Sequence, residues 1–453
     1  MKKNISIALA TAGLLTSMNL SAADSLETWI TDGKVSGNVR YYFIETHKDK
    51  SNGSSVSNHS HAIGGHISYE TAQWNGLSAG ATFMTTNGFF LPDNVDTSTL
   101  RRDDGVRKDG SPNSRRAEDS FSVLGEAYVN YKYEDLELLY GRKVIKTPLI
   151  HAKDVRMIPS AVSGAFAEYS IDAQNTIEVS YLTDFKQRTS NKFVNIVSHA
   201  LGDQTKEITG SRSGDLMFAD YRLKTDNLEF KIYDYYAEDF FNSVYTDAKY
   251  SGKISNEWGY SIAGQYIYQE SVGEADENLD KAGSATGGKQ ISANAYALKA
   301  SLKYKEASFG VAYSKVQRDR NKHDSLIMPY DGTPLFTNTI TSNVLFQSNY
   351  GKALTSDSIY IGGSKGVKLS YTQTYDFTGV KGFKTSVAYL NIDNSRFENA
   401  QQDFNLVLAY AKENFSLALK GIWINYNTTA NATGVIDQDQ NFAQYRVIGN
   451  YKF

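Results

Sequence analysis

The sequence contains no cysteine, only six prolines in 453 residues, and no long apolar run beyond its N-terminus. The lack of cysteine excludes a disulfide scaffold, a cysteine nucleophile and a thiolate metal site. A helix that spans a bilayer needs about 18 or more apolar residues in a row, so a helical inner-membrane protein is excluded as well. What is abundant is tyrosine (31) and glycine (35), and this balance is typical of many antiparallel strands.

Residues 1–23 have the form of a secretory signal peptide. Lys2 and Lys3 give a basic start, Ile5–Leu15 is a short apolar run, and Ser21-Ala22-Ala23 supplies small residues for cleavage. We predict that residues 1–23 are removed and that residues 24–453 form one domain. Without Lys2 and Lys3 the chain has 45 basic residues against 50 acidic ones, which argues against nucleic acid as a partner.

Apolar and polar residues alternate with a period of two along most of the chain. In the segment 35–43, Val35, Val39 and Phe43 fall on one face and Arg40 falls on the other. This period indicates strands with one apolar and one polar face. A helical period is nearly absent, and the one candidate is a short turn near residues 25–30.

The predicted connections alternate between short and long. The short turns lie near 73–76, 134–135, 172–175, 225–227, 256–257, 305–306, 378–382 and 412–414. The longer polar loops lie near 45–60, 87–119, 143–161, 186–213, 239–243, 270–290, 314–356, 394–401 and 427–439. Short turns on one side and long loops on the other are typical of a transmembrane β-barrel. We therefore predict an all-β, transmembrane antiparallel barrel of about 18 strands.

The last segment, 441–453, supports an outer-membrane location. Tyr445, Val447, Tyr451 and Phe453 share one face, and the chain ends on an aromatic residue. This is the form of an outer-membrane assembly signal. The alternative is the terminal strand of a soluble β-sandwich, but a soluble sheet of this length would usually show proline-blunted edges or a covering helix.

The stretch 143–169 departs from the strand pattern. It holds Pro148 and Pro159, which are unfavourable in a central strand. It also has too many apolar residues to indicate disorder. We predict that this third long loop folds inward and narrows a pore; the alternative is an ordinary packed surface loop. The candidate constriction residues are Lys153, Asp154, Arg156, Met157 and Pro159.

The polar face of each predicted strand points into the lumen of the barrel. The principal candidates for pore-lining cations are Arg40, Arg142, Lys368, Lys384, Lys420 and Arg446. Arg222, Lys231, Lys299 and Lys303 have the same phase, as do the acids Glu126 and Glu178. Charges on a pore wall select solutes at close range, and a file of cations favours carboxylates. The alternative is that any water-filled lumen is polar and that these lysines have no specific role.

The chain resembles the OprD family of outer-membrane porins, in its epsilon-proteobacterial form. The resemblance is strongest in 25–43, 123–169 and 446–453, and Arg156-Met157-Ile158-Pro159 matches an R-x-(I/L)-P turn of the family's third external loop. It implies an 18-stranded barrel with inward loops and a ladder of basic residues that guides carboxylate-bearing solutes.

Within that resemblance, Arg40, Lys368 and Arg446 match the ladder, and Arg40, Arg142 and Arg446 would face the third loop. Lysine stands at several positions where the family more often has arginine. Because lysine does not bind a carboxylate in a bidentate way, a less specific channel is expected.

The function predicted from the sequence is a passive outer-membrane diffusion channel for small hydrophilic solutes and ions, without covalent chemistry, cofactor or metal. A barrel-embedded hydrolase is disfavoured because no Ser/His/Asp order stands out. A surface adhesin stays open, and His59-Ser-His61 is weak evidence for a metal site. The expected partners are the lipid bilayer and the solutes. Monomer and homotrimer both stay open, with a slight preference for the homotrimer. The solute and the ion selectivity stay open too.

Overall fold

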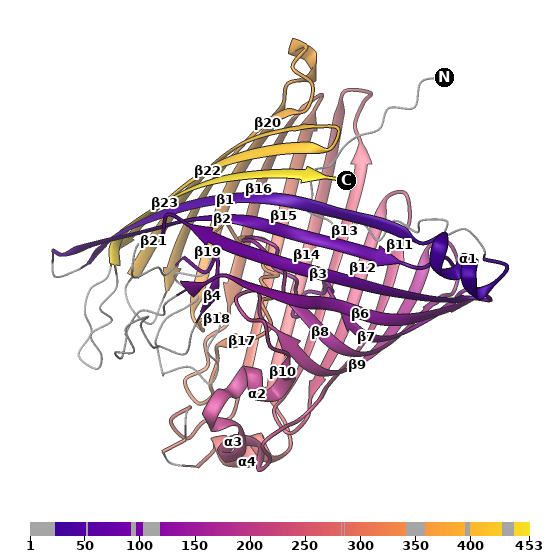
Figure 1. Ribbon diagram of the computed structural model, residues 1–453. Coiled ribbons are helices and arrows are strands. Elements are labelled where there is room, and N and C mark those ends of the chain that lie inside the picture. Colours follow the sequence, from indigo (N-terminus) through magenta and orange to yellow (C-terminus); the bar gives the residue numbers. More distant parts are fainter. Residues whose placement is uncertain are drawn as a thin grey trace.

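The computed structural model describes residues 23–50, 53–91, 97–102, 118–281, 283–284, 286–340, 358–394, 399–427 and 439–453. Within these ranges the chain forms a closed antiparallel barrel of eighteen strands, as predicted (Figure 1). The first nine are β1 (Lys34–Lys50), β2 (Ser55–Glu70), β3 (Leu77–Phe89), β6 (Phe121–Tyr133), β7 (Leu136–Lys143), β8 (Ala161–Ser170), β9 (Asn175–Lys186), β11 (Leu216–Lys224) and β12 (Leu228–Ala237). The others are β13 (Phe241–Lys253), β14 (Trp258–Ser271), β15 (Ser292–Tyr304), β16 (Ala307–Val316), β19 (Ser364–Thr374), β20 (Phe383–Asn394), β21 (Asn399–Lys412), β22 (Phe415–Asn427) and β23 (Asp439–Lys452).

Each barrel strand pairs with the next one along the chain, and β23 pairs with β1 to close the ring. Two further antiparallel pairs lie outside this ring, β4 (Arg101–Arg102) with β5 (Glu118–Asp119) and β17 (Leu326–Met328) with β18 (Ser358–Tyr360). The two-residue strand β10 (Val194–Asn195) adds a short pairing to β9. A closed ring leaves no unpaired edge, which is what a strand structure needs inside a bilayer.

The two faces of the wall differ as the alternation predicts. On β1, Val35 and Val39 are 59% and 49% exposed, whereas Tyr42 and Ile44 on the other face are fully buried. Ile262 on β14 and Leu298 on β15 are likewise largely exposed. Large exposed apolar side chains at every second residue are stable when they contact lipid, so this is the outer face of the barrel.

The two ends of the barrel differ in their connections. The short turns and the helix α1 (Leu26–Thr31) lie at one end, and α2 (Ile196–Leu201), α3 (Thr205–Thr209) and α4 (Glu274–Leu279) lie together beyond the other (Figure 1). Among the described residues there are also two single helical turns, η1 (Gly202–Gln204) and η2 (Asp376–Thr378). In the described part of the chain, no helix has both the length and the apolar character needed to span a bilayer. The predicted signal peptide stays a prediction, because of its residues only Ala23 is described.

Three local predictions were wrong. The predicted polar loop 45–60 is mostly strand, since β1 continues to Lys50 and β2 begins at Ser55. The predicted loop 239–243 is a tight connection, because β12 ends at Ala237 and β13 begins at Phe241. The helices α2, α3 and α4 were not predicted, because segments of five or six residues are too short to show a helical period.

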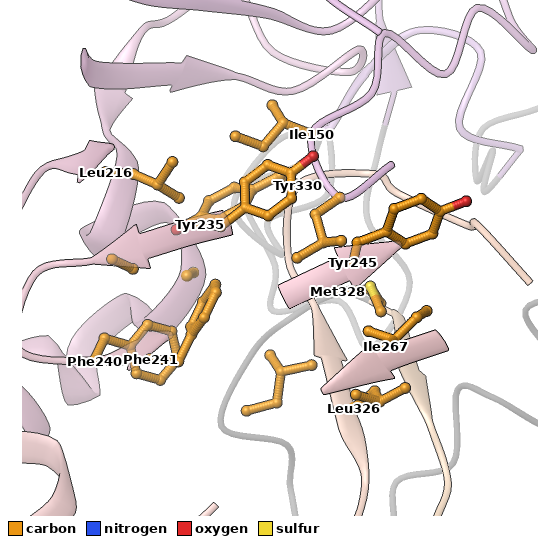
Figure 2. Packing of buried hydrophobic residues seen from close by; sticks show 14 of the residues in the cluster. Ile150, Leu216, Tyr235, Phe240, Phe241, Tyr245, Ile267, Leu326, Met328 and Tyr330 are labelled. Atoms are coloured by element: carbon orange, nitrogen blue, oxygen red, sulfur yellow. The ribbon is translucent and has the colours of Figure 1, made fainter. Parts of the chain in front are cut away.

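A packed apolar cluster joins one arc of the wall to two long loops. Figure 2 shows Ile150 and Tyr330, from the connections β7–β8 and β16–β19, beside Tyr235 of β12. All three side chains are at most 1% exposed. Burial of this much aromatic and aliphatic surface, at about 25 cal/mol per Å², fixes the two loops against the wall.

Gly65 on β2 is required by the close approach of β1. Its φ of +135° is unfavourable for other residues, and a Cβ placed on it would lie 2.0 Å from the carbonyl oxygen of Asn38. We expect Gly65→Ala to destabilise the barrel by about 1–3 kcal/mol. The measurement is the temperature at which the folded, heat-modifiable band disappears on a gel. Gly264→Ala is the control, because the nearest atom to its Cβ is 3.8 Å away; an equal effect of both substitutions would contradict the explanation.

Candidate functional site

The connection between β7 and β8, residues 144–160, contacts the side chain of Arg40 on β1. The guanidinium of Arg40 forms a two-contact ion pair with Asp154, in which Nη2 lies 3.0 Å from Oδ2. Its Nη1 also donates to the carbonyl oxygen of Arg156 at 2.7 Å, and its Nε donates to Asn450 of β23 at 2.7 Å. Arg40 therefore ties the connection to the seam between β1 and β23.

A second set of contacts surrounds Tyr42, two residues along the same face. The Tyr42 hydroxyl donates to the carbonyl oxygen of Val155 at 2.8 Å. Arg156 donates from Nε to the carbonyl oxygen of Thr97 at 3.0 Å, which links a third connection, β3–β6. Met157 is 3% exposed and packs in the same apolar cluster as Tyr42 and Leu100. These contacts combine apolar burial with charge-assisted hydrogen bonds, which are the stronger class.

Asp331, from the β16–β19 connection, joins three loop segments. Its carboxylate is 2% exposed, is paired with Arg188, lies 3.5 Å from Lys153 Nζ, and accepts a hydrogen bond of 2.6 Å from Ser160. Next to it, His151 donates from its backbone to Tyr330 at 2.9 Å. The three segments are thus held by a buried carboxylate with two cationic partners.

Pro159 ends this connection beside β9. Its carbonyl oxygen accepts a hydrogen bond of 2.9 Å from Lys186 Nζ, and Lys186 is fully buried. Proline has no backbone donor to satisfy, so only its carbonyl needs a partner here.

In these loops, burial and neighbouring cations have opposite effects on the pKa of a carboxyl group. Burial alone would raise the pKa of the Asp331 carboxyl, but Arg188 and Lys153 lower it to about 2. Burial also opposes the effect of Arg40 at Asp154, and the pKa of Asp154 is lowered overall. Burial lowers the pKa of His151, and Lys146 adds to the effect.

A lowered carboxyl pKa stabilises the folded state above the unfolded-state pKa, and that stabilisation is lost as pH falls through the folded-state value. We therefore expect the loops to stay docked above about pH 4 and to loosen as the pH falls toward about 2. Hydrogen exchange of residues 145–160 as a function of pH is the measurement. Loosening that begins near neutral pH would contradict this assignment.

The β16–β19 connection reaches strands far apart around the ring. Gln265 of β14 donates to the Pro334 carbonyl at 2.9 Å, and Lys368 of β19 donates to the Asn338 carbonyl at 2.7 Å. On β21, Asn405 accepts a hydrogen bond of 2.9 Å from the backbone of Ile340. One connection that contacts β14, β19 and β21 lies across the inner face of this arc, because those side chains alternate with the lipid-facing ones.

The predicted wall cations fall into two groups. Lys420 and Arg446 are directly opposite each other on β22 and β23, and both lie within electrostatic reach of Tyr42, as does Arg156. Arg446 is 2% exposed and donates from Nε to Gln444 at 2.7 Å. Together with Arg40 they form what we call the basic wall: Arg40, Lys420 and Arg446.

The remaining predicted cations have other partners. Arg142 on β7 lies over the ring of Phe193, 4.4 Å from its centroid. Lys368 is bound by the loop carbonyl of Asn338, and Lys384 lies one residue after the start of β20, opposite Thr374. The structure therefore brings together only part of the predicted set, and the assignment of these residues to a conducting path stays a prediction.

A cluster of acids around Arg222 was only partly predicted. Arg222 contacts Glu168 at 2.7 Å, Asp220 at 2.8 Å and Glu178 at 3.1 Å. Arg222 and Glu178 were predicted to point inward, but Glu168 and Asp220 were missed. The signal for Asp220 was its two-residue spacing from Arg222, which puts both side chains on one face of β11.

His59 and His61, the weak candidates for a metal site, pack against each other with their rings in an edge-to-face arrangement. The ring centroids of His59 and His61 are 6.2 Å apart, and Tyr41 hydrogen-bonds His61 Nδ1 at 3.1 Å. In the residues that the structure describes, no three His, Cys, Asp or Glu side chains come together as a metal site.

Comparison with known proteins gives three kinds of result. Residues 27–453 match the family model described as outer membrane porin, OprD family. A search of curated protein sequences finds no match. Solved structures show the same fold at low sequence identity, and three of them illustrate this.

OccK9 (OpdG) of Pseudomonas aeruginosa has a TM-score of 0.72 at 16% identity, with 94% of this chain and 100% of that chain covered. OccAB1 of Acinetobacter baumannii has a TM-score of 0.71 at 13% identity, covering 94% and 98%. P. aeruginosa OpdK, described as a structure with vanillate, has a TM-score of 0.68 at 13% identity, covering 94% and 99%. With nearly the whole chain matched by the family model, the protein belongs to the OprD family of outer membrane porins, which are passive channels for small solutes rather than enzymes.

Proposed function

We propose that residues 144–160 fold into the lumen and form the constriction of this porin, with Lys153, Asp154 and Arg156 at its edge. The observation that carries the proposal is the ion pair between Arg40 and Asp154. The connection leaves the wall at β7 and returns at β8, yet it is bound to β1, which is four barrel strands away from β7. A segment that binds the non-lipid face of a distant strand has to pass over or through the lumen.

We further propose that the solutes carry a carboxylate and pass along the basic wall. Arg40 has one charge partner in Asp154, and Lys420 and Arg446 add two cations beside it. Fixed charges of one sign at short range favour a counter-charged solute, provided that the binding is weak enough for release. The vanillate in the OpdK structure is a carboxylate, which is consistent with this solute class.

The test is single-channel conductance of the purified protein in a planar bilayer, with the reversal potential measured under a salt gradient. Stable steps with anion-leaning selectivity, reduced by added small carboxylates, are expected. A folded, heat-modifiable barrel that gave no steps would contradict an open constriction. Cation-leaning steps that carboxylates do not affect would contradict the solute class but leave the pore intact.

The oligomeric state and the narrower phylogenetic type are also proposals. For the homotrimer, the candidate contact surface is a concave apolar groove of about 710 Å³ on the outer face of β14–β20, lined by residues such as Ile262, Leu302 and Leu369. Such a surface packs equally well against lipid or another barrel. Chemical crosslinking in native membranes distinguishes the two, because a trimer gives a ladder and a monomer gives none. The epsilon-proteobacterial type rests on the sequence resemblance alone.

A further inference from the structure

The outer face of the barrel carries a second hollow, away from the lumen and near the loop end of the wall. It has a volume of about 410 Å³, and its floor is formed by Phe404, Trp423, Ala443 and His47. These residues are neighbours across β21, β22, β23 and β1, since Phe404 pairs with Trp423, Trp423 with Ala443, and Ala443 with His47. Phe404 and Trp423 are 40% and 37% exposed, so the row faces outward.

Two small residues create the hollow. Ala443 stands between the large side chains of Trp423 and His47, so the row has a notch at that position. On β22, a Cβ placed on Gly421 would lie 2.4 Å from the indole of Trp423. The six-membered ring of Trp423 therefore extends along the strand over Gly421, and the side chain is 37% exposed on the outer face.

The rings of the aromatic floor contact one another. The ring of Trp423 lies 5.7 Å from Phe404 and 5.9 Å from Tyr445, and Tyr445 lies 6.2 Å from the ring of His47. His47 is itself fixed, because Ser57 contacts its Nδ1 at 3.0 Å and Glu45 its Nε2 at 3.2 Å. Rigid aromatic planes lose little entropy when a ligand binds.

A polar tier lies above this floor. Gln402, Asn425, Asn441 and Asp49 also line the hollow and pair with one another across the same four strands. They are two residues nearer to the loops than the aromatic row, a step of about 6.8 Å along a strand. Aromatic side chains below polar ones mark the membrane–water interface, where a ligand would be apolar on one side and hydrated on the other.

The chemistry of the lining selects the occupant. Three carboxamides both donate and accept hydrogen bonds, which suits hydroxyl and amide groups. Among the residues that the structure describes, the lining contains no lysine or arginine and has one carboxylate, Asp49, so the part of the ligand that it would bind is its hydroxyl and amide groups rather than a phosphate. Flat aromatic faces beside amides suit the sugar ring of a lipid head, whose apolar face can lie on an aromatic plane.

We propose that this hollow binds the saccharide head of a glycolipid in the outer leaflet of the outer membrane. The sugar ring lies on Trp423 in the notch at Ala443, and its hydroxyls bond to Asn425 and Asn441. The acyl chains continue down the apolar face of β21–β23, past Leu406 and Leu419, which are part of that face. The porin would thus hold one lipid at a defined place on its rim.

The test uses native mass spectrometry of the full barrel in a detergent without sugar, with rough lipopolysaccharide or phosphatidylglycerol as the added lipid. Ala443→Leu fills the notch, and Asn425→Ala with Asn441→Ala removes the polar tier. Ala300→Leu is the matched control, because Ala300 lies in an apolar hollow on the same outer face but far around the ring. Single-channel conductance, unchanged in all variants, verifies that each barrel is folded.

We expect wild type and Ala300→Leu to retain the lipopolysaccharide equally, and both site variants to retain it about tenfold less. Phosphatidylglycerol retention should be the same in all four proteins. Equal lipopolysaccharide retention in all four would overturn the proposal. A loss of phosphatidylglycerol in the site variants as large as the loss of lipopolysaccharide would also overturn it, because the hollow would then bind acyl chains without recognising the sugar.

Discussion

Asp331→Asn is expected to loosen the β7–β8 connection from the β9–β11 and β16–β19 connections. The substitution keeps the shape of the side chain but leaves Arg188 and Lys153, which are 14% and 12% exposed, without their shared carboxylate. Removing one partner of a buried ion pair costs about 3–5 kcal/mol. Hydrogen exchange of residues 145–160 should accelerate by about two orders of magnitude or more. The open level of single channels should become larger and noisier.

Asp393→Asn is the matched control for this prediction. It removes the same charge from an ion pair with Lys365 that is 3.7 Å long and about half exposed on both sides. Exposed pairs contribute little to stability, so exchange in 145–160 should not change. If Asp331→Asn also left that exchange unchanged, the three segments would be held by apolar packing alone. The stabilising role assigned to the ion pairs of Asp331 would then be wrong.

Replacing Lys420 and Arg446 together by glutamine is expected to move the selectivity toward cations. A unit charge about 6 Å from a passing ion changes its energy by about 0.7 kcal/mol in water. Two such charges, partly screened by salt, correspond to a change of about two- to tenfold in the anion-to-cation permeability ratio. The reversal potential under a salt gradient measures it directly.

Lys305→Gln serves as the control for this change. Lys305 lies in the turn between β15 and β16, is 56% exposed and pairs with Glu257, so its charge is far from the proposed path. Lys420→Gln alone should give about half the change in the free energy that corresponds to the permeability ratio. This single variant can still be measured if loss of the buried Arg446 impairs folding. A reversal potential that is unchanged in the double variant would exclude the basic wall from the conducting path.

The strands and turns could be predicted because their signals are local. The helix α1 and tight turns such as 134–135 and 305–306 lie where the sequence indicated. The loop predicted at 45–60 failed for a physical reason. There the outward face of β1 and β2 carries Glu45, His47 and His59 instead of apolar residues. Apolar alternation stops where lipid contact ends, but the backbone ladder continues beyond it.

Contacts between distant segments were harder to predict. The sequence analysis placed Arg40 opposite the loop that holds Asp154, and the structure pairs these two residues, but a role in conduction stays a prediction. Nothing in a single sequence indicated that Asp331 would meet Lys153 and Arg188, because these residues come from three different connections. Strand phase alone was sufficient to predict Asp220 beside Arg222, and this signal was overlooked.

The pairing of β1 with β23 has a consequence for how the protein is made. Arg40 and Asn450 are hydrogen-bonded across a sequence separation of 410 residues, and Gly37 and Phe453 exchange two backbone hydrogen bonds. No barrel can close until the final residues of the chain have been synthesised and delivered. Until then two long strand edges are unpaired, which invites aggregation. Folding that depends on contacts this distant is slow, so closure between β1 and β23 is expected to be the late step in the formation of this barrel.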